Sequence, residues 1–304
     1  MKRVVSISLG SSKRDKSVEI ELGGQKILVE RIGTDGSISL MKLKYKELDN
    51  EVDAFGIGGT KHALYVNGRV YPLPELKDVG KGIKTKIFDG EGVKEVLEEK
   101  IADFIENNSD ITLKGKKGYM PSAVDRYSMA LSLEKAGVKM WYGDFASALH
   151  LPIYLPSLKY INFVAPIIIP PILNGISFFG IRLWKGIPFK ELYPTGKRQE
   201  KTTIKKIKQL ENAEIIAGDC LYIKDNLPES LEGKIIITNT TTEEDFKLFE
   251  SRGVSYLITT TPRMEGRSFG TNVMEAVFYA CGYHDKIEEG AKKLGIKPEI
   301  KKFN

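Results

Sequence analysis

Two loops near the C-terminal end of the chain combine hydroxyl groups, glycines and arginines. They read TNTTTEED at 238–245 and TTTPRMEGRSFGTN at 259–272, and each follows a short apolar run and opens a predicted helix. The first turn of a helix directs unpaired backbone N–H groups at an anion. Arginine can grip a phosphate or carboxylate with two N–H groups at once. These loops therefore predict an anion site made from Arg263, Arg267, Ser268, Gly270, Thr271 and Asn272.

Helix capping is the simpler explanation for part of this pattern. Thr240 or Thr241 ahead of Glu243 is an ordinary helix cap. Ser268 or Thr271 can likewise be only a cap. The two arginines are harder to explain in this way, because placing both beside glycines in one loop is costly when no anion is present.

One acidic residue stands where a dinucleotide-binding fold keeps an acid. Asp144 ends a predicted strand about 20 residues beyond a strand-to-helix turn, the spacing of the acid that holds the adenosine ribose. The glycine-rich turn itself is missing, because SAVDRYSMAL has no glycine between Gly118 and Gly137. Asp144 as a helix cap is thus an equal alternative. The predicted cofactor is NAD or NADP, with candidate binding residues Asp125, Asp144, Asp219, Thr240, Thr241, Thr242, Thr261, Pro262 and Gly266.

Three residues are candidates for catalytic proton transfer, namely Lys13, Lys94 and Asp89. Asp89 precedes a predicted helix, which favours a cap over a general base. The stretch 11–15 is most simply a solvated hairpin tip, but if it folds over a cleft, Lys13 and Arg14 can bind a carboxylate. No Ser-His-Asp set, GxSxG turn or HExxH motif is present. The three histidines and two cysteines are widely spaced, so no metal site is predicted.

The N-terminal third reads as strands and hairpins with two helices. Gly23-Gly24 and Asn67-Gly68 are hairpin turns by type. The apolar pattern predicts strands at 3–9, 17–22, 26–32, 52–57, 63–66 and 69–73, and helices at 38–48 and 91–106. The polar, basic stretch 107–117 then marks a boundary. We therefore expect a smaller α+β domain over residues 1–110.

Strands and helices alternate in the remainder of the chain. The predicted strands are 118–123, 138–142, 214–217, 234–238 and 255–259, and the predicted helices are 125–136, 202–211, 243–251 and 270–281. Repeated units of this size predict an α/β, Rossmann-like domain over residues 111–304, with a mostly parallel sheet and helices on both faces. Ligands of such sheets bind beyond the carboxyl ends of the strands. The candidate residues of the C-terminal loops stand at those ends.

An apolar insert at 151–200 interrupts the alternation. The stretch INFVAPIIIPPIL at 161–173 has no charge, and its apolar character continues patchily to Trp184. Its three prolines argue against a membrane-spanning helix, because each removes a backbone hydrogen bond that lipid cannot replace. A buried segment between domains or in a homodimer is the prediction. A membrane-surface contact or a hydrophobic lid is the alternative.

The composition is that of an ordinary soluble protein, with 41% hydrophobic and 28% charged residues. The net charge of +6 is spread thinly over 304 residues, which does not favour a nucleic acid as the partner. The N-terminal apolar run is too short for a signal peptide. Two cysteines cannot build a disulfide framework. A cytoplasmic location is therefore expected.

Several stretches carry a family likeness, which runs nearly the full length of the chain. They are GDCLYIKDNLPESLEGKIIITNTTTEED, LITTTPRMEGRSFGTNVMEA, VVSISLGSSKRD, RIGTDG, SAVDRYSMA and YPTGKRQE. In these stretches the chain resembles a bacterial family often labelled quinate 5-dehydrogenase. The resemblance implies NAD(P)-linked oxidation of a cyclic hydroxy acid on a Rossmann domain. The chain departs from shikimate and quinate dehydrogenases in the glycine-rich turn and in the Asn-Val-Thr-x-Pro-x-Lys stretch, which has no counterpart in residues 1–110.

Taken together, these patterns predict a cytoplasmic oxidoreductase-like enzyme. It would bind NAD(P) and a small anionic hydroxy acid in a cleft between two domains. The alternative is a non-catalytic module that binds a phosphorylated or carboxylated metabolite. Arg263, Arg267 and the helix that begins near Phe269 would hold that metabolite.

Overall fold

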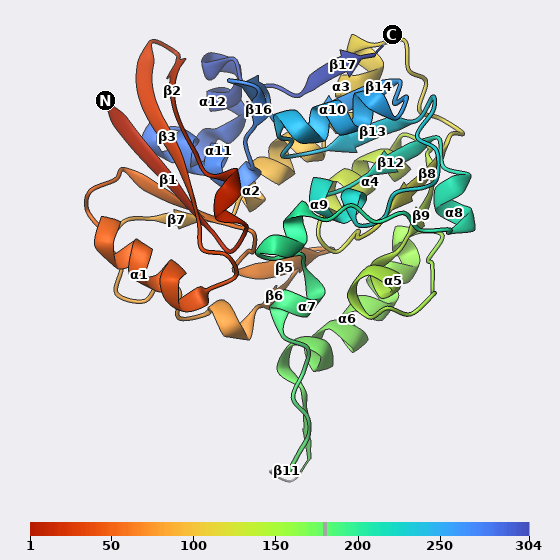
Figure 1. Ribbon diagram of the computed structural model, residues 1–304, viewed down its shortest axis with the longest axis horizontal. Helices are drawn as coiled ribbons and strands as arrows, with labels where there is room; N and C mark the ends of the chain where they lie inside the picture. The colour runs from red at the N-terminus through yellow and green to blue at the C-terminus, as the bar shows by residue number, and fades with distance from the viewer. Residues whose placement is uncertain (179–180, 304) are drawn as a thin grey trace.

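The computed structural model describes residues 1–178 and 181–303, and within them two larger sheets lie side by side (Figure 1). The strands of the N-terminal region are β1 (Lys2–Ser8), β2 (Lys16–Leu22), β3 (Gln25–Gly33), β4 (Ala54–Gly58), β5 (Ala63–Val66), β6 (Arg69–Pro72) and β7 (Ile87–Phe88). Its helical segments are η1 (Ser12–Arg14), α1 (Ile38–Leu48), η2 (Pro74–Leu76), α2 (Glu91–Val93), η3 (Lys94–Glu98) and α3 (Ile101–Asn108).

The remainder of the chain adds ten strands and eleven helical segments among the described residues. The strands are β8 (Lys117–Met120), β9 (Lys139–Tyr142), β10 (Ile176–Phe178), β11 (Ile181–Trp184), β12 (Ile215–Ala217), β13 (Ile235–Thr238), β14 (Tyr256–Thr259), β15 (Arg263–Met264), β16 (Arg267–Ser268) and β17 (Glu299–Lys302). The helical segments are α4 (Tyr127–Lys135), α5 (Asp144–Ala148), α6 (Leu158–Asn174), α7 (Phe189–Leu192), η4 (Lys197–Glu200), α8 (Lys208–Glu211), α9 (Cys220–Lys224), α10 (Glu243–Ser251), α11 (Thr271–Ala280), η5 (His284–Lys286) and α12 (Ile287–Leu294).

The first sheet has the order β2-β3-β1-β4-β7, and all its pairings except the β2–β3 hairpin are parallel. Alternate residues of its central strands enter different cores. Val4 and Ala54 pack with helices α11 and α12, whereas Val5 and Phe55 pack with α1. The two hairpins predicted from glycine-containing turns are confirmed.

The second sheet has the order β17-β14-β13-β12-β8-β9, parallel except for β17. Ile215 and Ile216 point to opposite cores, and helices cover both faces. The predicted α/β class, with mostly parallel sheets flanked by helices, is therefore confirmed. The chain adds β9 on one side of β8 and β12 on the other, so the strand order reverses between β8 and β12 and the carboxyl ends of these two strands form the topological switch point.

The two sheets exchange covering helices. Helices α11 and α12 lie between β14 and β17 of the second sheet in the chain but pack on the first sheet, where Met274 and Phe278 are fully buried. Helix α3 precedes the second sheet and buries Ile101 and Ile105 in its core. Neither core is thus built from one continuous stretch, and the boundary at residue 110 stays a prediction.

Three predicted helices take a different form. The single helix expected at 91–106 contains a π-helical turn, η3, which brings both Lys94 and Glu98 into buried positions. The helix expected at 202–211 is helical only at Lys208–Glu211, because the backbone of Thr203 pairs with that of Lys224 and Leu227 instead. The helix predicted at 125–136 begins later, at Tyr127.

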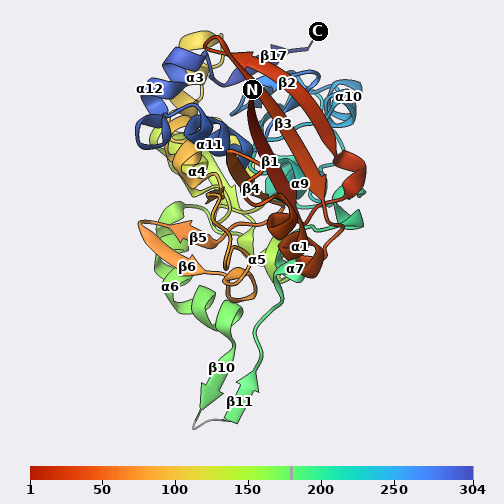
Figure 2. The ribbon, with the colours of Figure 1, turned by 90° about the vertical axis from the view of Figure 1, so that its left-hand side faces the viewer.

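The apolar insert forms a continuous helix, α6, in spite of Pro166, Pro170 and Pro171. Beyond it, the strands β10 and β11 project from the body of the molecule as a hairpin (Figure 2). The prolines do not interrupt this helix, and α6 packs its buried side on the core of the second sheet. Residues 179–180 of the insert lie outside the described residues. No helix among those described is long and apolar enough to span a membrane, and the homodimer stays a prediction.

Glu275 on α11 provides a test of how the helix packs on the first sheet. Its carboxylate accepts the N–H of Gly90 at 2.7 Å, and burial, together with the charge of Asp89, raises the pKa of Glu275 from 4.5 to about 7. The folded protein therefore holds a proton between pH 4.5 and 7 that the unfolded chain releases, so this group lowers stability as pH rises through that window.

Glu275→Gln keeps an acceptor for Gly90 and removes the titration. We expect the free energy of unfolding at pH 8 to rise by about 1–3 kcal/mol in urea denaturation. The exposed Glu244→Gln serves as the control and should leave the pH profile unchanged. Parallel pH profiles for Glu275→Gln and the unchanged protein would contradict the argument.

Candidate functional site

A cavity of about 210 Å³ lies where the carboxyl ends of the two sheets meet. The segments that follow β1, β4, β8, β12 and β13 line it, together with the start of α11 and one side of α6. A single water needs about 10–15 Å³ of such space, so the cavity can hold a small molecule. It lies between the two sheets, and the sequence predicts a ligand in a cleft between two domains.

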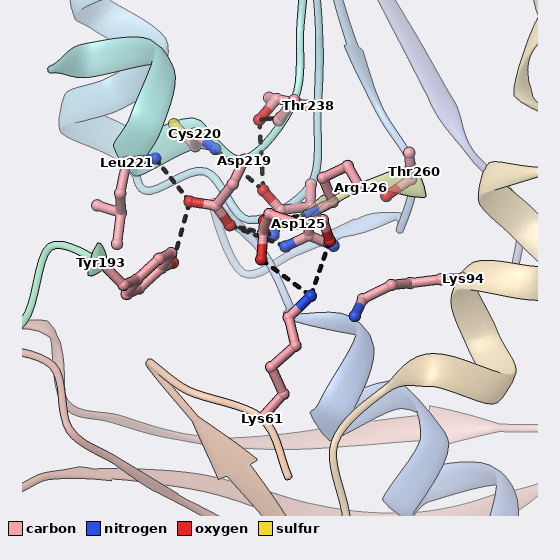
Figure 3. Close-up of polar contacts among 12 residues, drawn as sticks. Lys61, Lys94, Asp125, Arg126, Tyr193, Asp219, Cys220, Leu221, Thr238 and Thr260 are labelled. Atoms are coloured by element: carbon pink, nitrogen blue, oxygen red, sulfur yellow. Dashed lines mark hydrogen bonds and ion pairs between the residues drawn. The ribbon is translucent and has the colours of Figure 1, made fainter. Parts of the chain in front are cut away.

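A buried ionic network forms one wall of the cleft (Figure 3). Its centre is Arg126, which is only 6% exposed and follows β8. Its guanidinium donates to Glu98 at 2.8 Å and to Asp219 at 2.8 Å, and its Nε lies 3.2 Å from Asp125. The network therefore joins the turn η3 to the loops after both strands of the switch point.

Two lysines complete the network from the side of the first sheet. Lys61 follows β4. Its Nζ lies 2.9 Å from the carboxylate of Asp125 and donates to the backbone carbonyl of Asp125 at 2.8 Å. Lys94 pairs with Glu91 at 2.9 Å. Burial lowers the pKa of Lys61. Burial also acts to lower the pKa of Lys94, but the charges of Glu91, Asp125 and Glu98 together outweigh it and the net shift is upward.

The charges of this network nearly balance within the described residues. Lys61, Lys94 and Arg126 face four carboxylates, those of Glu91, Glu98, Asp125 and Asp219. Asp219 is also fully engaged: it accepts from Tyr193 and Leu221 on one oxygen and from Arg126 and Asn239 on the other. The buried Nε of Arg126 and one carboxylate oxygen each of Glu98 and Asp125 have no hydrogen-bond partner among the described residues. The network nevertheless has no excess positive charge for an anionic ligand to neutralise, because its carboxylates outnumber its cations.

A second cluster in the cleft has an excess of positive charge. Arg14, Arg31 and Arg267 all contact the cavity. Arg31 donates to Asp15 at 2.7 Å, and Arg14 lies 3.9 Å from Asp245, which Lys224 already pairs with at 2.6 Å. The three guanidinium groups therefore have two carboxylates near them, and one of the two, that of Asp245, is already paired with Lys224. We call these three residues the arginine cluster.

Burial and mutual repulsion destabilise the charged form of two of the guanidinium groups in the arginine cluster. Burial and the neighbouring Arg14 and Arg31 lower the pKa of Arg267 to about 9. Burial and Arg14 likewise lower the pKa of Arg31 to about 10. The buried Nε atoms of Arg14 and Arg267 have no hydrogen-bond partner among the described residues. Unpaired donors in a buried, positively charged site are costly, and an anion would relieve both costs.

The start of α11 faces the same cleft. Gly270 precedes this helix without a side-chain cap, and Gly270, Thr271 and Asn272 contact the cavity. The last residues of β1 and β4 are tightly packed, since a Cβ atom on Gly58 would lie 2.9 Å from the Cβ of Ser8. The helix dipole thus adds to the positive field of the arginine cluster.

The predicted anion set divides between two sides of a small hairpin. In β15–β16, Arg263 pairs with Ser268 and Met264 with Arg267, so side chains at 263 and 267 point in opposite directions. Arg267 enters the cleft, whereas Arg263 stacks on Phe246 and pairs with Glu243 at 3.0 Å. The predicted residues that contact the cavity are Arg267, Gly270, Thr271 and Asn272, and those outside it are Arg263 and Ser268.

The predicted cofactor residues divide in the same way. Those in contact with the cavity are Asp125, Asp144, Asp219 and Thr240, and those outside it are Thr241, Thr242, Thr261, Pro262 and Gly266. Thr242 is a helix cap in a capping box with Asp245, and Thr241 is buried against Ser268. Capping therefore explains Thr242 alone, and the prediction that Thr240 or Thr241 caps this helix is wrong.

The turn after β8 does not fit a dinucleotide. Asp144 accepts the N–H groups of Ala123 at 3.1 Å and Val124 at 2.9 Å, and the hydroxyl of Ser122 at 3.1 Å. A pyrophosphate at this turn would need the same N–H groups. Burial raises the pKa of Asp144 to about 6 in spite of these bonds. The carboxylate that the spacing assigned to a ribose thus closes the turn instead.

The three proton-transfer candidates are not brought together. Lys94 and Asp89 contact the cavity. Lys13 is largely exposed and pairs with Glu200 at 2.9 Å, outside the cavity. Asp89 accepts the N–H groups of His62 and Glu91, but the residue that caps α2 is Gly90, without a side-chain hydrogen bond, so the prediction that Asp89 caps this helix is wrong.

Sequence reasoning missed Arg31 and Glu98. Arg31 follows Ile27 and Val29 at alternate positions of β3, and this alternation places a charge on the inward side of the strand. Glu98 lies four residues after Lys94, beside the apolar stripe of the predicted helix. A charge at an inward position was the available signal in both cases.

Removal of Arg126 tests the network. Arg126→Met leaves Glu98 and Asp219 buried without their cation, and we expect a loss of about 3–5 kcal/mol in the free energy of unfolding, measured in urea. Lys135 pairs with Glu99 at the surface, so Lys135→Met is the matched control with a loss of about 1 kcal/mol or less. Equal losses in the two variants would contradict a structural role for the network.

Comparison with solved structures finds similarity at low identity. A galactofuranose binding protein is 11% identical to this chain, and the aligned region covers 99% of this chain and 95% of that protein, with a TM-score of 0.36. A protein from Mycobacterium smegmatis in complex with β-D-fucofuranose is 9% identical over 100% of both chains, with a TM-score of 0.31. One subunit of the dipicolinate synthase from Bacillus halodurans is 13% identical over 83% and 87% of the two chains, with a TM-score of 0.27. Similarity of this degree says nothing of what this chain binds.

No curated protein matches the chain. Family models match it in two parts. Residues 3–89 match the model described as Domain of unknown function (DUF8753), and residues 92–303 match the one described as Domain of unknown function (DUF8754). The two matches meet just before α2, where the chain leaves β7. Because the second match spans more than half of the chain, the chain belongs to the family described as Domain of unknown function (DUF8754).

Proposed function

We propose that the protein binds a small anionic molecule in the cleft between its two sheets. The acidic group, a phosphate or a carboxylate, lies among Arg14, Arg31 and Arg267, with the start of α11 beside it. This is the module that the sequence offers as the alternative to an enzyme. Its anion site keeps Arg267 and replaces Arg263 by Arg14 and Arg31.

The observation that carries the proposal is the uncompensated charge of the arginine cluster. Arg267 is 7% exposed, its Nε has no partner among the described residues, and its neighbours lower its pKa. Burying an unpaired charge costs several kcal/mol. A bound anion supplies the missing countercharge, and guanidinium groups hold phosphate and carboxylate in paired hydrogen bonds.

The ionic network around Arg126 supports the same placement by contrast. It lies in the same cleft but pairs its cations with its own carboxylates. An anion placed there would displace existing pairs, whereas Arg267 of the arginine cluster has no carboxylate within ion-pair distance among the described residues, so an anion can bind it without displacing one.

An NAD(P)-linked oxidation finds less support in the same residues. The turn after β8 lacks the glycines of a dinucleotide site, and Asp144 already accepts its N–H groups. Lys94 and Asp89 contact the cavity, but each has a partner that explains its position. We therefore propose binding alone for this cleft and assign it no reaction.

Arg267→Ala tests the proposal in a thermal-shift titration with inorganic phosphate and with malonate. Phosphate at ten times its dissociation constant should stabilise the unchanged protein by about 1.4 kcal/mol. Arg267→Ala should lose this stabilisation, because it removes the most buried guanidinium of the cluster. Ionic strength is held constant with NaCl to remove general screening.

Arg263→Ala is the matched control, since it lies in the same hairpin but points away from the cleft. It should keep the full response to phosphate. An equal response in both variants, or no response in the unchanged protein to either anion, would refute the proposed site.

A further inference from the structure

One side of α6 forms an apolar wall of the cleft. The wall residues recur at spacings of three and four, which is one face of a helix; they are Ile161, Val164, Ala165, Ile168, Ile169 and Ile172. Ile161, Ala165 and Ile169 are buried against the second sheet. Val164, Ile168 and Ile172 are only half-buried and border the cavity.

The opposite face of α6 points away from the cleft. Tyr160, Phe163 and Ile167 are exposed, with Phe163 at 72%. Ile167 and Ile168 are thus adjacent in the chain and identical in type, but Ile167 faces solvent and Ile168 faces the cavity.

The cleft therefore has two chemically different parts. The arginine cluster and the start of α11 make one part polar and positive, while α6 supplies aliphatic side chains to the other. Figures 1 and 2 show α6 and α11 in separate parts of the molecule, and residues of both helices line the cavity. Leu173 near the end of α6 and Leu149 after α5 extend the apolar surface of the cavity.

We propose that the ligand is amphipathic and joins the acidic group to an aliphatic chain. This inference rests on the proposed anion site and adds the class of molecule. The acidic group pairs with the arginine cluster, and the chain covers the half-buried stripe Val164, Ile168 and Ile172. A fully polar metabolite would leave that stripe against water or against its own polar groups, which are both unfavourable.

A series of straight-chain alkyl phosphates tests the inference, from ethyl to decyl phosphate, each below its micelle concentration. Isothermal titration calorimetry gives the dissociation constants, with inorganic phosphate as the reference ligand. Each added methylene that reaches the wall should tighten binding up to about fourfold, the fold-change that corresponds to about 0.8 kcal/mol per buried CH₂.

Ile168→Gln should flatten this dependence on chain length and leave the affinity for inorganic phosphate unchanged. Ile167→Gln is the matched control on the outer face and should keep the dependence. Equal affinities for phosphate and octyl phosphate in the unchanged protein would overturn the inference while the anion site stands. A dependence that survives Ile168→Gln would also overturn it, because the chain then binds elsewhere. If neither inorganic phosphate nor any of the alkyl phosphates binds, the proposed anion site itself is refuted.

Discussion

The buried guanidinium of Arg126 is the interaction on which the arrangement of the cleft depends. A cation this deep needs carboxylates around it, and the chain supplies Glu98 from the π-helical turn and Asp219 from the loop after β12. Asp125 beside it then draws Lys61 across from the first sheet. One charge therefore fixes the loops at the switch point of the second sheet and ties them to the carboxyl end of β4.

Charge balance then decides which part of the cleft is open to a ligand. The Arg126 network pairs its cations internally, so it serves as structure. The arginine cluster lacks enough carboxylates, and the start of α11 reinforces its positive field. Helix α6 closes the other side with aliphatic residues. The same cavity thus combines a place for an acidic group with a surface for an apolar chain.

Local patterns predicted local structure well, and long-range pairings decided what they missed. Helix α10 spans the predicted residues, because its capping box with Thr242 and Asp245 lies within four residues. The packing of α11 on the first sheet joins residues more than 200 positions apart, which no local pattern reveals. Arg263 and Arg267 looked equivalent in the loop, and only the β15–β16 pairing separates them. Asp144 has the spacing of a ribose-binding acid, but its direction depends on the backbone of a distant turn.

The most direct measurement of the central claim is an anomalous difference map from crystals soaked in selenate, recorded at the selenium edge. Selenate has the shape and charge distribution of the phosphate and sulfate that arginine clusters hold. We expect a selenate peak within hydrogen-bond distance of Arg14, Arg31 and Arg267, and we expect this peak to be absent from Arg267→Ala crystals. Selenate peaks elsewhere on the molecule with none at the arginine cluster would contradict it.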